Sequence, residues 1–380
     1  MAKPAARLEV AAIYCPLWHN YDHASSWKGQ GWCEWELVKS AVPRFPGHHL
    51  PLRPEWGCFD ESDPAWAARE IALAADGGID VFIFDWYWYS GVKLMEEALE
   101  RGFLRAANRR RLKFALMWAN HDWADYFPPP FGKPWNSWLP SRHSPGDLER
   151  AIDYCIARYF RKPNYWRVGG RLFFSMFQPV KLVKELGGPE AARRCFARLD
   201  RRLGAAGLPP LHWNAMLWGP EPVPELKAAG FRSTTTYNIT DSGKGAPGLI
   251  QQYSDLVAAH QSFWRKMQAA PLVLCPVVTM GWDVTQRCVP DLPWPFPPSP
   301  ASGRHDYPYG HVVVGNTPER FGKLCRLAAE HAGGCSPRPF AVFVNAWNEW
   351  TEGSYLLPEK RTGLAYLQAL QQALAPRRGR

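Results

Sequence analysis

Two glutamates near the end of the chain have a spacing that could support acid–base chemistry. Glu349 and Glu352 are three residues apart in a polar segment that directly follows an apolar run. Paired carboxyl groups cleave glycosidic bonds as a nucleophile and an acid, or as a base and an acid. Because both glutamates belong to one segment, they fit poorly to opposite faces of such a bond. The alternative is that one glutamate only orients the other or caps a helix.

Aromatic, amide and carboxyl side chains recur just beyond the apolar runs. Aromatic rings can cover the C–H faces of sugars while carboxylates and amides bind hydroxyls, so these residues predict a carbohydrate site. The chain contains 20 tryptophans, and the alternative for each is packing inside the fold. The predicted substrate-binding residues of this kind are Trp18, Asp85, Trp86, Tyr87, Trp88, Trp118, Asn120, His121, Asp122, Tyr237, Trp282, Asp283, Asn348 and Trp350.

Other reaction chemistries find little support in the sequence. Histidines occur at 19 and 23, at 48 and 49, and at 121, but none belongs to an HExxH or Cys/His pattern with zinc spacing. The chain has neither the Gly-x-Ser-x-Gly elbow of serine hydrolases nor a phosphate-binding P-loop. The sequence therefore predicts no metal and no cofactor.

The elements that would position these residues alternate regularly along the chain. Eight short apolar segments resemble buried parallel strands: 11–17, 81–87, 112–118, 172–177, 211–217, 233–237, 272–279 and 340–346. Helix-like segments lie between them, and a last helix is expected at 362–374. Eight such units predict an α/β fold, a single (β/α)8 TIM barrel. A doubly wound open sheet is the competitor, but no GxGxxG loop supports it.

Start signals and long connections complete this prediction. Asp63-Pro64, Ser144-Pro145 and Thr317-Pro318 each pair a helix N-cap with proline at the first helical position. The connections 18–63, 119–144 and 281–316 are much longer than usual, which is typical of functional loops. All three follow strands, so we expect them on the carboxyl-terminal face of the barrel, where barrel enzymes carry their active sites.

Composition sets further limits. The 380 residues are expected to form one domain, with a core at about 11–374 and a short basic C-terminal tail. The net charge of +10 is spread over the chain without a nucleic-acid-binding motif, so we predict solvated basic residues and no nucleic-acid partner. An acidic polysaccharide would also suit this charge.

The cellular setting is an expectation from the same composition. The nine cysteines are scattered and odd in number, which favours reduced thiols. No secretory signal is seen, and no stretch approaches the roughly 20 apolar residues of a membrane span. As the chain stands, these features predict a cytoplasmic protein without a membrane span; the alternative is a periplasmic or secreted protein whose signal was removed.

Several motifs together resemble one known family. They are residues 31–35 (Gly-Trp-Cys-Glu-Trp), 46–51 (Pro-Gly-His-His-Leu-Pro), 78–82 (Gly-Ile-Asp-Val-Phe), 118–120 (Trp-Ala-Asn), 281–283 (Gly-Trp-Asp) and 345–353 (Asn-Ala-Trp-Asn-Glu-Trp-Thr-Glu-Gly). Across about 11–374 the chain is similar to WbsX-type proteins, relatives of the endo-α-mannosidases of glycoside hydrolase family 99. The resemblance adds Glu34 and Trp35 to the predicted substrate-binding residues.

The resemblance also implies roles for the glutamate pair. In family 99 a Glu-Trp-x-Glu motif carries both catalytic carboxyl groups, so Glu349 would be the general base and Glu352 the general acid. The base removes a proton from the sugar's own 2-hydroxyl, which attacks C1 to give a 1,2-anhydro sugar. Water then opens this intermediate with retention, and neither glutamate has to attack C1 from the opposite face. The implied function is a retaining glycoside hydrolase acting on an α-linked oligo- or polysaccharide.

The chain departs from the family pattern at a few positions. His121 and Asp122 follow Trp-Ala-Asn where relatives usually carry an acidic residue directly, and Thr351 replaces a frequent histidine. Cys15 and Trp18 replace a more common proline-rich strand end. These changes bear on the identity of the sugar more than on the reaction class. Two alternatives remain: a glycosyltransferase or transglycosylase of polysaccharide biosynthesis, and a carbohydrate-binding barrel without activity.

Overall fold

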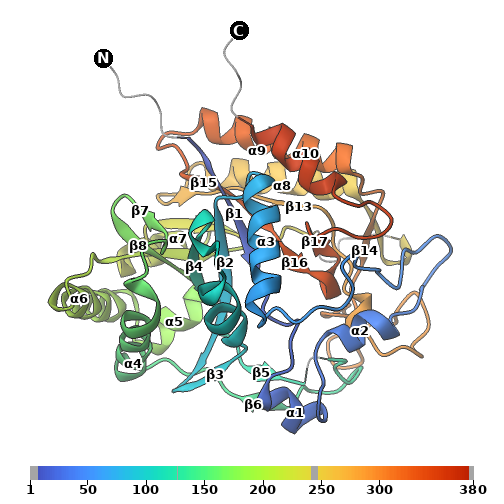
Figure 1. Cartoon of the computed structure of the whole chain (residues 1–380), viewed down its shortest axis with the longest axis horizontal. Helices are drawn as coiled ribbons and strands as arrows, with labels where there is room; N and C mark the ends of the chain where they lie inside the picture. The colour runs from blue at the N-terminus through green and yellow to red at the C-terminus, as the bar shows by residue number, and fades with distance from the viewer. Residues whose placement is uncertain (1–6, 126, 241–246, 376–380) are drawn as a thin grey trace.

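The chain folds around a curled parallel sheet of the TIM-barrel type (Figure 1). The computed structural model describes residues 7–125, 127–240 and 247–375. The predicted basic tail at 376–380 lies outside these residues. The barrel strands are β1 (Glu9–Tyr14), β2 (Val81–Tyr89), β4 (Lys113–Trp118), β8 (Arg171–Met176), β9 (Leu211–Met216), β10 (Ser233–Thr235), β12 (Val273–Leu274), β13 (Val277–Thr279) and β15 (Ala341–Asn345). Each corresponds to a predicted strand, so the predicted fold class is confirmed.

The seventh predicted strand closes the sheet and is divided in two. Its first part, β12, pairs with β10, and its second part, β13, pairs with β15. Pro276 has no N–H for the ladder and interrupts regular pairing between them. Hydrogen bonds to both neighbouring strands nevertheless continue beside Pro276. Cys275 N donates to Thr234 O (2.8 Å), and Phe343 N donates to Pro276 O (2.8 Å).

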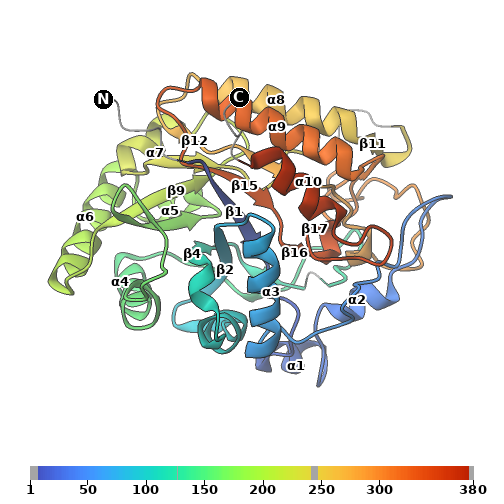
Figure 2. The same ribbon diagram turned by 45° about the horizontal axis from the view of Figure 1, so that its top comes forward.

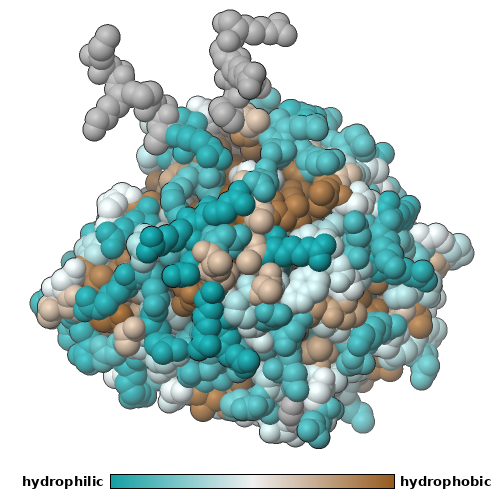
Figure 3. Space-filling view, in the orientation of Figure 1, coloured by the Kyte–Doolittle hydropathy of each residue, from teal (hydrophilic) through white to brown (hydrophobic). Residues whose placement is uncertain are grey.

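Helices cover the outside of the sheet. They are α3 (Pro64–Asp76), α4 (Pro145–Cys155), α5 (Pro179–Glu185), α6 (Pro189–Ala205), α7 (Val223–Ala229), α8 (Tyr253–Met267), α9 (Pro318–Gly334) and α10 (Ala365–Leu374). Figures 1 and 2 show α8, α9 and α10 side by side on one flank. The space-filling view shows a mainly hydrophilic surface with scattered hydrophobic residues (Figure 3).

The predicted helix starts are confirmed in detail. The side chains of Asp63, Ser144 and Thr317 accept hydrogen bonds from the first-turn N–H groups of α3, α4 and α9, respectively. In each helix proline occupies the first position, where no N–H is needed. These caps fix where the chain leaves the loop face and turns back along the barrel.

The three long connections contain small elements of their own. The first holds α1 (Asp22–Lys28) and α2 (Trp35–Ser40), and the second holds the antiparallel pair β5 (Trp123–Ala124) and β6 (Ser137–Leu139). The third holds the 3₁₀ turn η6 (Thr285–Arg287) and β14 (Val312–Val314), which pairs with β11 (Ile250–Gln252). In Figure 1, α1, α2, β5 and β6 lie at the end towards which the β1 arrow points.

A small second hydrophobic cluster lies among these loops, apart from the barrel core. It consists of Leu249, Cys288, Phe296 and Tyr309, with Phe131 and Trp294 packed against it. The barrel core is a much larger continuous cluster. The loop face therefore has packing of its own, which supports the segments that surround the carboxyl ends of the strands.

Candidate active site

Glu349 and Glu352 follow the last barrel strand and point into one cavity. Residues Asn348–Glu349 form the short strand β16, and Trp350–Glu352 form the 3₁₀ turn η7. Gly353 ends the turn with φ of 66°, and a Cβ there would lie 3.0 Å from Asp283. This tight turn places both carboxyl groups in the mouth of the barrel, where they are 3% and 6% exposed.

The cavity that they share, called the central cavity below, has a volume of about 460 Å³. Its lining combines aromatic rings with carboxyl, amide and imidazole groups, which is the composition of a sugar site. The lining residues are Leu17, Asp85, Tyr87, Met117, Ala119, His121, Trp123, Phe127, Phe177, Gln178, Trp218, Tyr237, Asn238, Thr240, Trp282, Arg287, Tyr307, Glu349 and Glu352.

Arg287 is the cation that the glutamate pair shares. Its Nη2 lies 2.9 Å from Glu349 Oε1, and its Nη1 lies 2.6 Å from Glu352 Oε1. The Nη2 atom is also 3.2 Å from Glu34 Oε2. The Arg287 side chain is 5% exposed, so these charge-assisted hydrogen bonds are shielded from water. One planar guanidinium therefore fixes three carboxyl groups relative to one another.

Burial and mutual repulsion shift the proton affinity of the pair. Burial, opposed by the charge of Arg287 and reinforced by the charge of Glu352, raises the pKa of Glu349 to about 8. Burial also raises the pKa of Glu352, opposed by Arg287 and by Tyr307, whose hydroxyl donates to Glu352 Oε1 at 2.9 Å. Groups this close titrate as a pair. In the free site at neutral pH, the pair holds a proton, and the donors around Glu352 favour Glu349 as its carrier.

A third acid, Asp85, also lines the central cavity, close enough to Glu349 for the two carboxyl groups to interact. Its Oδ2 accepts a hydrogen bond from Cys15 Sγ (3.7 Å), and the same sulfur is 3.5 Å from the Tyr237 hydroxyl. Burial, followed by the charge of Glu349, raises the pKa of Asp85 well above its ordinary value. Within the described residues, the buried Asp85 Oδ1 has no hydrogen-bond partner. The raised pKa favours the protonated form of Asp85, which can offer a hydrogen bond to a bound hydroxyl.

The structure brings part of the predicted site together. Glu349, Glu352, Asp85, Tyr87, His121, Tyr237 and Trp282 all line the central cavity. Burial lowers the pKa of His121, so its ring is neutral near pH 7 and can bind hydroxyl groups. The other predicted substrate-binding residues do not line the central cavity.

Strand alternation removes Trp86 and Trp88 from the cavity. Successive side chains of a strand point to opposite faces, so Asp85 and Tyr87 face the cavity while the two tryptophans face the helices. Their rings stack on each other at 5.6 Å, and Trp88 Nε1 donates to Asp147 on α4 (3.3 Å). Both residues are packing residues, which corrects the prediction of substrate contact.

Four more of the predicted substrate-binding residues, Trp18, Trp35, Trp118 and Asn120, are buried and pack against neighbouring side chains or loops. Trp18 packs on Trp35 at 4.4 Å, and Trp118 packs on His143 at 5.2 Å; each of these tryptophans is at most 3% exposed. Asn120 is fully buried, and its Nδ2 donates to Gln178 O (3.0 Å). These side chains hold the loops in place and do not line the cavity.

The last segment and the first long loop supply three further corrections: Asn348, Trp350 and Glu34 do not line the central cavity. Asn348 exchanges hydrogen bonds with the backbone N and O of Cys15 (2.8 and 3.0 Å), and Trp350 stacks on Tyr355 at 4.1 Å. Glu34 lies behind the pair, where it contacts Arg287 and accepts from Thr351. Each residue supports the segment that carries Glu349 and Glu352 without lining the central cavity.

Asp122 and Asp283 do not line the central cavity, which corrects the prediction for both residues. Asp122 pairs with Lys181 (2.9 Å) and accepts from Ser141 N outside the cavity. Asp283 Oδ2 lies 2.7 Å from His48 Nε2 and lines a separate cavity of about 530 Å³. Trp282 lines both cavities, so neighbouring residues of one loop face opposite sides of the same wall.

Sequence reasoning missed Arg287 and Tyr307, which contact the glutamate pair directly. Both come from the long connection after β13, where nothing in the local sequence marks either residue. One signal was available: a buried group of carboxylates needs a cation, because unpaired buried charges are strongly disfavoured. That signal calls for an arginine or lysine from the long loops, without saying which one.

The part of the chain that the structure describes contains neither a metal-binding cluster nor a membrane-spanning helix. Across 7–125, 127–240 and 247–375, no group of three or more His, Cys, Asp or Glu side chains is arranged to hold a metal ion. Within the same ranges, no helix has the length and apolar character needed to cross a membrane. All nine cysteines, each of them described, are free thiols.

Comparison with known families and curated proteins covers nearly the whole chain. A family model described as "Glycosyltransferase WbsX" matches residues 10–370. An uncharacterized protein WxcX of Xanthomonas campestris pv. campestris is 29% identical over 375 residues, and so is its counterpart in a second strain. The match takes in 96% of this chain and 49% of the relative, so the chain spans about half the length of the curated proteins it matches.

Comparison with solved structures shows the same fold at low identity. The family 99 endo-α-mannosidase of Bacteroides thetaiotaomicron aligns with a TM-score of 0.57 and 16% identity, over 96% of each chain. A glycoside hydrolase-like protein aligns with a TM-score of 0.62 and 14% identity, over 98% of this chain and 97% of the other. At these identities the likeness concerns the fold.

Proposed function

This chain belongs to the WbsX family, and we propose that it is a carbohydrate-active enzyme that cleaves an α-linked glycan with retention. The observation that carries the proposal is the arrangement of Glu349 and Glu352. Both carboxyl groups reach one aromatic-lined cavity and share Arg287. Acids placed together in a water-poor cavity with raised pKa values are typical of acid–base catalysis.

The proposed first step uses the substrate's own hydroxyl. Glu349 takes the proton of the sugar 2-hydroxyl, O2 forms a bond to C1, and the C1–O bond to the leaving group breaks. Glu352 gives its proton to the leaving oxygen. In the second step Glu352 takes a proton from water, the water oxygen bonds to C1, and the C1–O2 bond breaks while O2 regains a proton from Glu349. Both carboxyl groups return to their starting states.

These two reaction steps require that Glu352 carries a proton when the glycan is bound. In the free site the surrounding donors favour Glu349 as the carrier. A sugar 2-hydroxyl that donates to Glu349 stabilises its ionised form and so lowers its pKa. Because the two groups titrate as a pair, the proton then belongs to Glu352. Substrate binding itself sets the two roles.

The test is digestion of an oligosaccharide panel followed by kinetics on the confirmed substrate. We expect Glu349→Gln and Glu352→Gln each to lower kcat/KM by about 10²–10⁴-fold, the usual contribution of a general acid or base. Glu190 is an exposed glutamate on α6. The variant Glu190→Gln is therefore the matched control and is expected to keep full activity. Unchanged turnover in both site variants contradicts the proposal, and binding of glycans without cleavage favours a carbohydrate-binding protein.

Transfer to a sugar acceptor is the second candidate, favoured by the description of the matching family model. In that case an acceptor hydroxyl replaces water in the second step, with the same residues in the same roles. Incubation with and without added acceptor separates the two reactions. Longer products indicate transfer, whereas shorter products alone indicate hydrolysis.

A further inference from the structure

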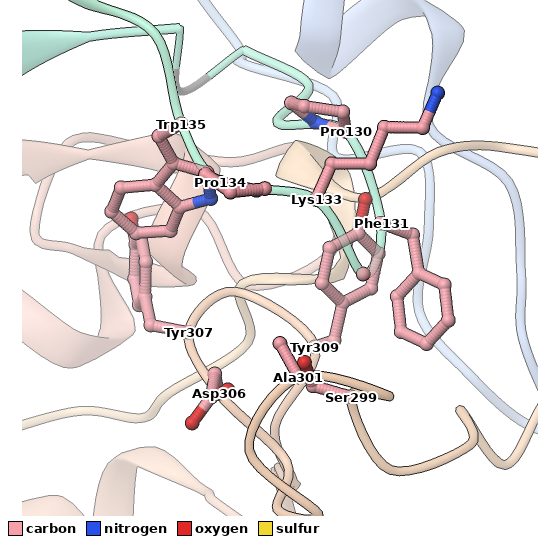
Figure 4. Close-up of a pocket in the computed structure, with 11 residues that line it drawn as sticks. Pro130, Phe131, Lys133, Pro134, Trp135, Ser299, Ala301, Asp306, Tyr307 and Tyr309 are labelled. Carbon is pink, nitrogen blue, oxygen red and sulfur yellow. The ribbon is translucent and has the colours of Figure 1, made fainter.

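A second, smaller cavity lies beside the central cavity and has no role in the steps above. This outer cavity has a volume of about 330 Å³ and is shown in Figure 4. One wall is the loop between β5 and β6, and the other is part of the connection between β13 and β14. The lining residues are Pro130, Phe131, Gly132, Lys133, Pro134, Trp135, Ser299, Ala301, Asp306, Tyr307 and Tyr309.

The walls of the outer cavity are largely aromatic and are held in place by contacts with each other. The Trp135 ring meets the Tyr307 ring edge-on at 6.5 Å, and Phe131 meets Tyr309 edge-on at 4.9 Å (Figure 4). The Tyr309 hydroxyl donates to Pro129 O at 2.6 Å, which joins the two loops. Trp135 is 39% exposed, so part of its ring surface is open to a ligand.

Such a surface matches the chemistry of a pyranose ring. Indole and phenol rings cover the apolar C–H faces of a sugar, and polar groups at the margin bind its hydroxyls. Asp306 and Lys133 line the same cavity and can supply these polar groups. The outer cavity therefore has the features of a sugar-binding site, and its position shows which sugar would use it.

Tyr307 connects the two cavities at the proposed acid. Its side chain lines both of them, and its hydroxyl donates to Glu352 Oε1 at 2.9 Å and contacts Arg287. A general acid must lie within hydrogen-bond reach of the oxygen that it protonates. The glycosidic oxygen therefore sits next to Glu352, and the leaving sugar begins on the side of Tyr307.

We propose that the outer cavity binds the saccharide on the leaving-group side of the cleaved bond, with Trp135 as its main platform. This proposal rests on the proposed function, because it takes Glu352 as the acid. The sugar whose C1 reacts occupies the central cavity, and the chain continues past Tyr307 between the two loops. In a transfer reaction the acceptor approaches C1 along the path by which the leaving group departs. The same outer cavity then holds the acceptor sugar.

The test compares two substrates that share the reacting sugar. One is the cleaved oligosaccharide, and the other is the corresponding glycosyl fluoride, whose small leaving group occupies no sugar site. We expect Trp135→Ala to lower kcat/KM about tenfold more for the oligosaccharide than for the fluoride, as loss of one aromatic platform implies. Trp218→Ala is the matched comparison, because this 52% exposed tryptophan lines the central cavity. It is expected to lower both values by a similar factor.

The outcomes separate this proposal from the proposed function. If the wild-type protein cleaves both substrates and Trp135→Ala changes both equally or neither, the outer cavity is not the leaving-group site. If the wild-type protein cleaves neither substrate, the proposed function fails, and the assignment of the outer cavity fails with it. A circular dichroism melt of each variant excludes loss of folding as the cause of a lower rate.

Discussion

Replacing Glu349 with glutamine is expected to stabilise the protein at alkaline pH while it removes activity. Burial raises the pKa of Glu349 to about 8, against an ordinary value near 4.5. A carboxyl group whose folded pKa is raised reduces stability as pH rises from its unfolded pKa towards its folded pKa. The amide carries no charge at any of these pH values, so the variant lacks this loss.

The size of the effect follows from the two pKa values. Between pH 5 and pH 8.5 the wild-type protein loses on the order of 4 kcal/mol of unfolding free energy through this group, at about 1.4 kcal/mol per pKa unit. That figure is an upper estimate, because Glu349 and Glu352 titrate together. We therefore expect the stability difference, variant minus wild type, to grow by about 2–4 kcal/mol over this range.

Urea denaturation at pH 5 and pH 8.5 measures this difference directly. Glu190→Gln is the control, since its exposed carboxylate should give the same stability difference at both pH values. A difference for Glu349→Gln that does not change between the two pH values would refute the reasoning. It would mean that Glu349 is already ionised at pH 5, with Arg287 outweighing burial.

Four other outcomes follow from the same structure. Arg287→Met should lower the unfolding free energy by about 3–5 kcal/mol at pH 8.5 in urea denaturation, because three carboxyl groups lose their buried cation. The loss of unfolding free energy should be smaller at pH 5. Equal losses at the two pH values would contradict the argument from charge. The kcat/KM of the wild type should fall above about pH 8 as the pair loses its shared proton, and a rate–pH profile that stays flat to pH 9.5 would oppose this. In initial-rate kinetics, Asp85→Asn should keep kcat/KM within about tenfold of the wild-type value, and Asp85→Ala should lower it about 100-fold. The reason is that the protonated Asp85 acts through hydrogen bonds, which an amide can also make. Similar losses of kcat/KM in the two variants would point to an ionised Asp85. Asp63→Ala should lower the unfolding free energy by about 1 kcal/mol through loss of the α3 cap and leave kcat/KM unchanged.

Sequence reasoning reached the barrel because its signals are local. Strands buried on both faces must be apolar along their whole length, and helix starts need a polar cap beside proline, so both are visible in short windows. The division of the seventh strand at Pro276 was not predicted, although a proline, which cannot donate to the ladder, marks the position in the sequence. Only the pairing of its two halves with different neighbours required the structure.

The site was predicted only where strand geometry determines it. Asp85 and Tyr87 lie on one face of β2, Glu349 follows β15, and all three reach the cavity. The exclusion of Trp86 and Trp88 was within reach, because alternation along β2 places them on the other face. Arg287 was not, because its contacts with Glu349 and Glu352 span more than 60 residues and depend on how a long loop folds.

The small hydrophobic cluster of Leu249, Cys288, Phe296 and Tyr309 has a consequence for how this family can diversify. Because the cluster is separate from the barrel core, the segments that surround the active site are anchored to one another as well as to the strands. Changes in these segments are therefore expected to leave the packing of the barrel core intact. The packing of the loop face and the packing of the barrel are thus encoded in largely separate parts of one sequence.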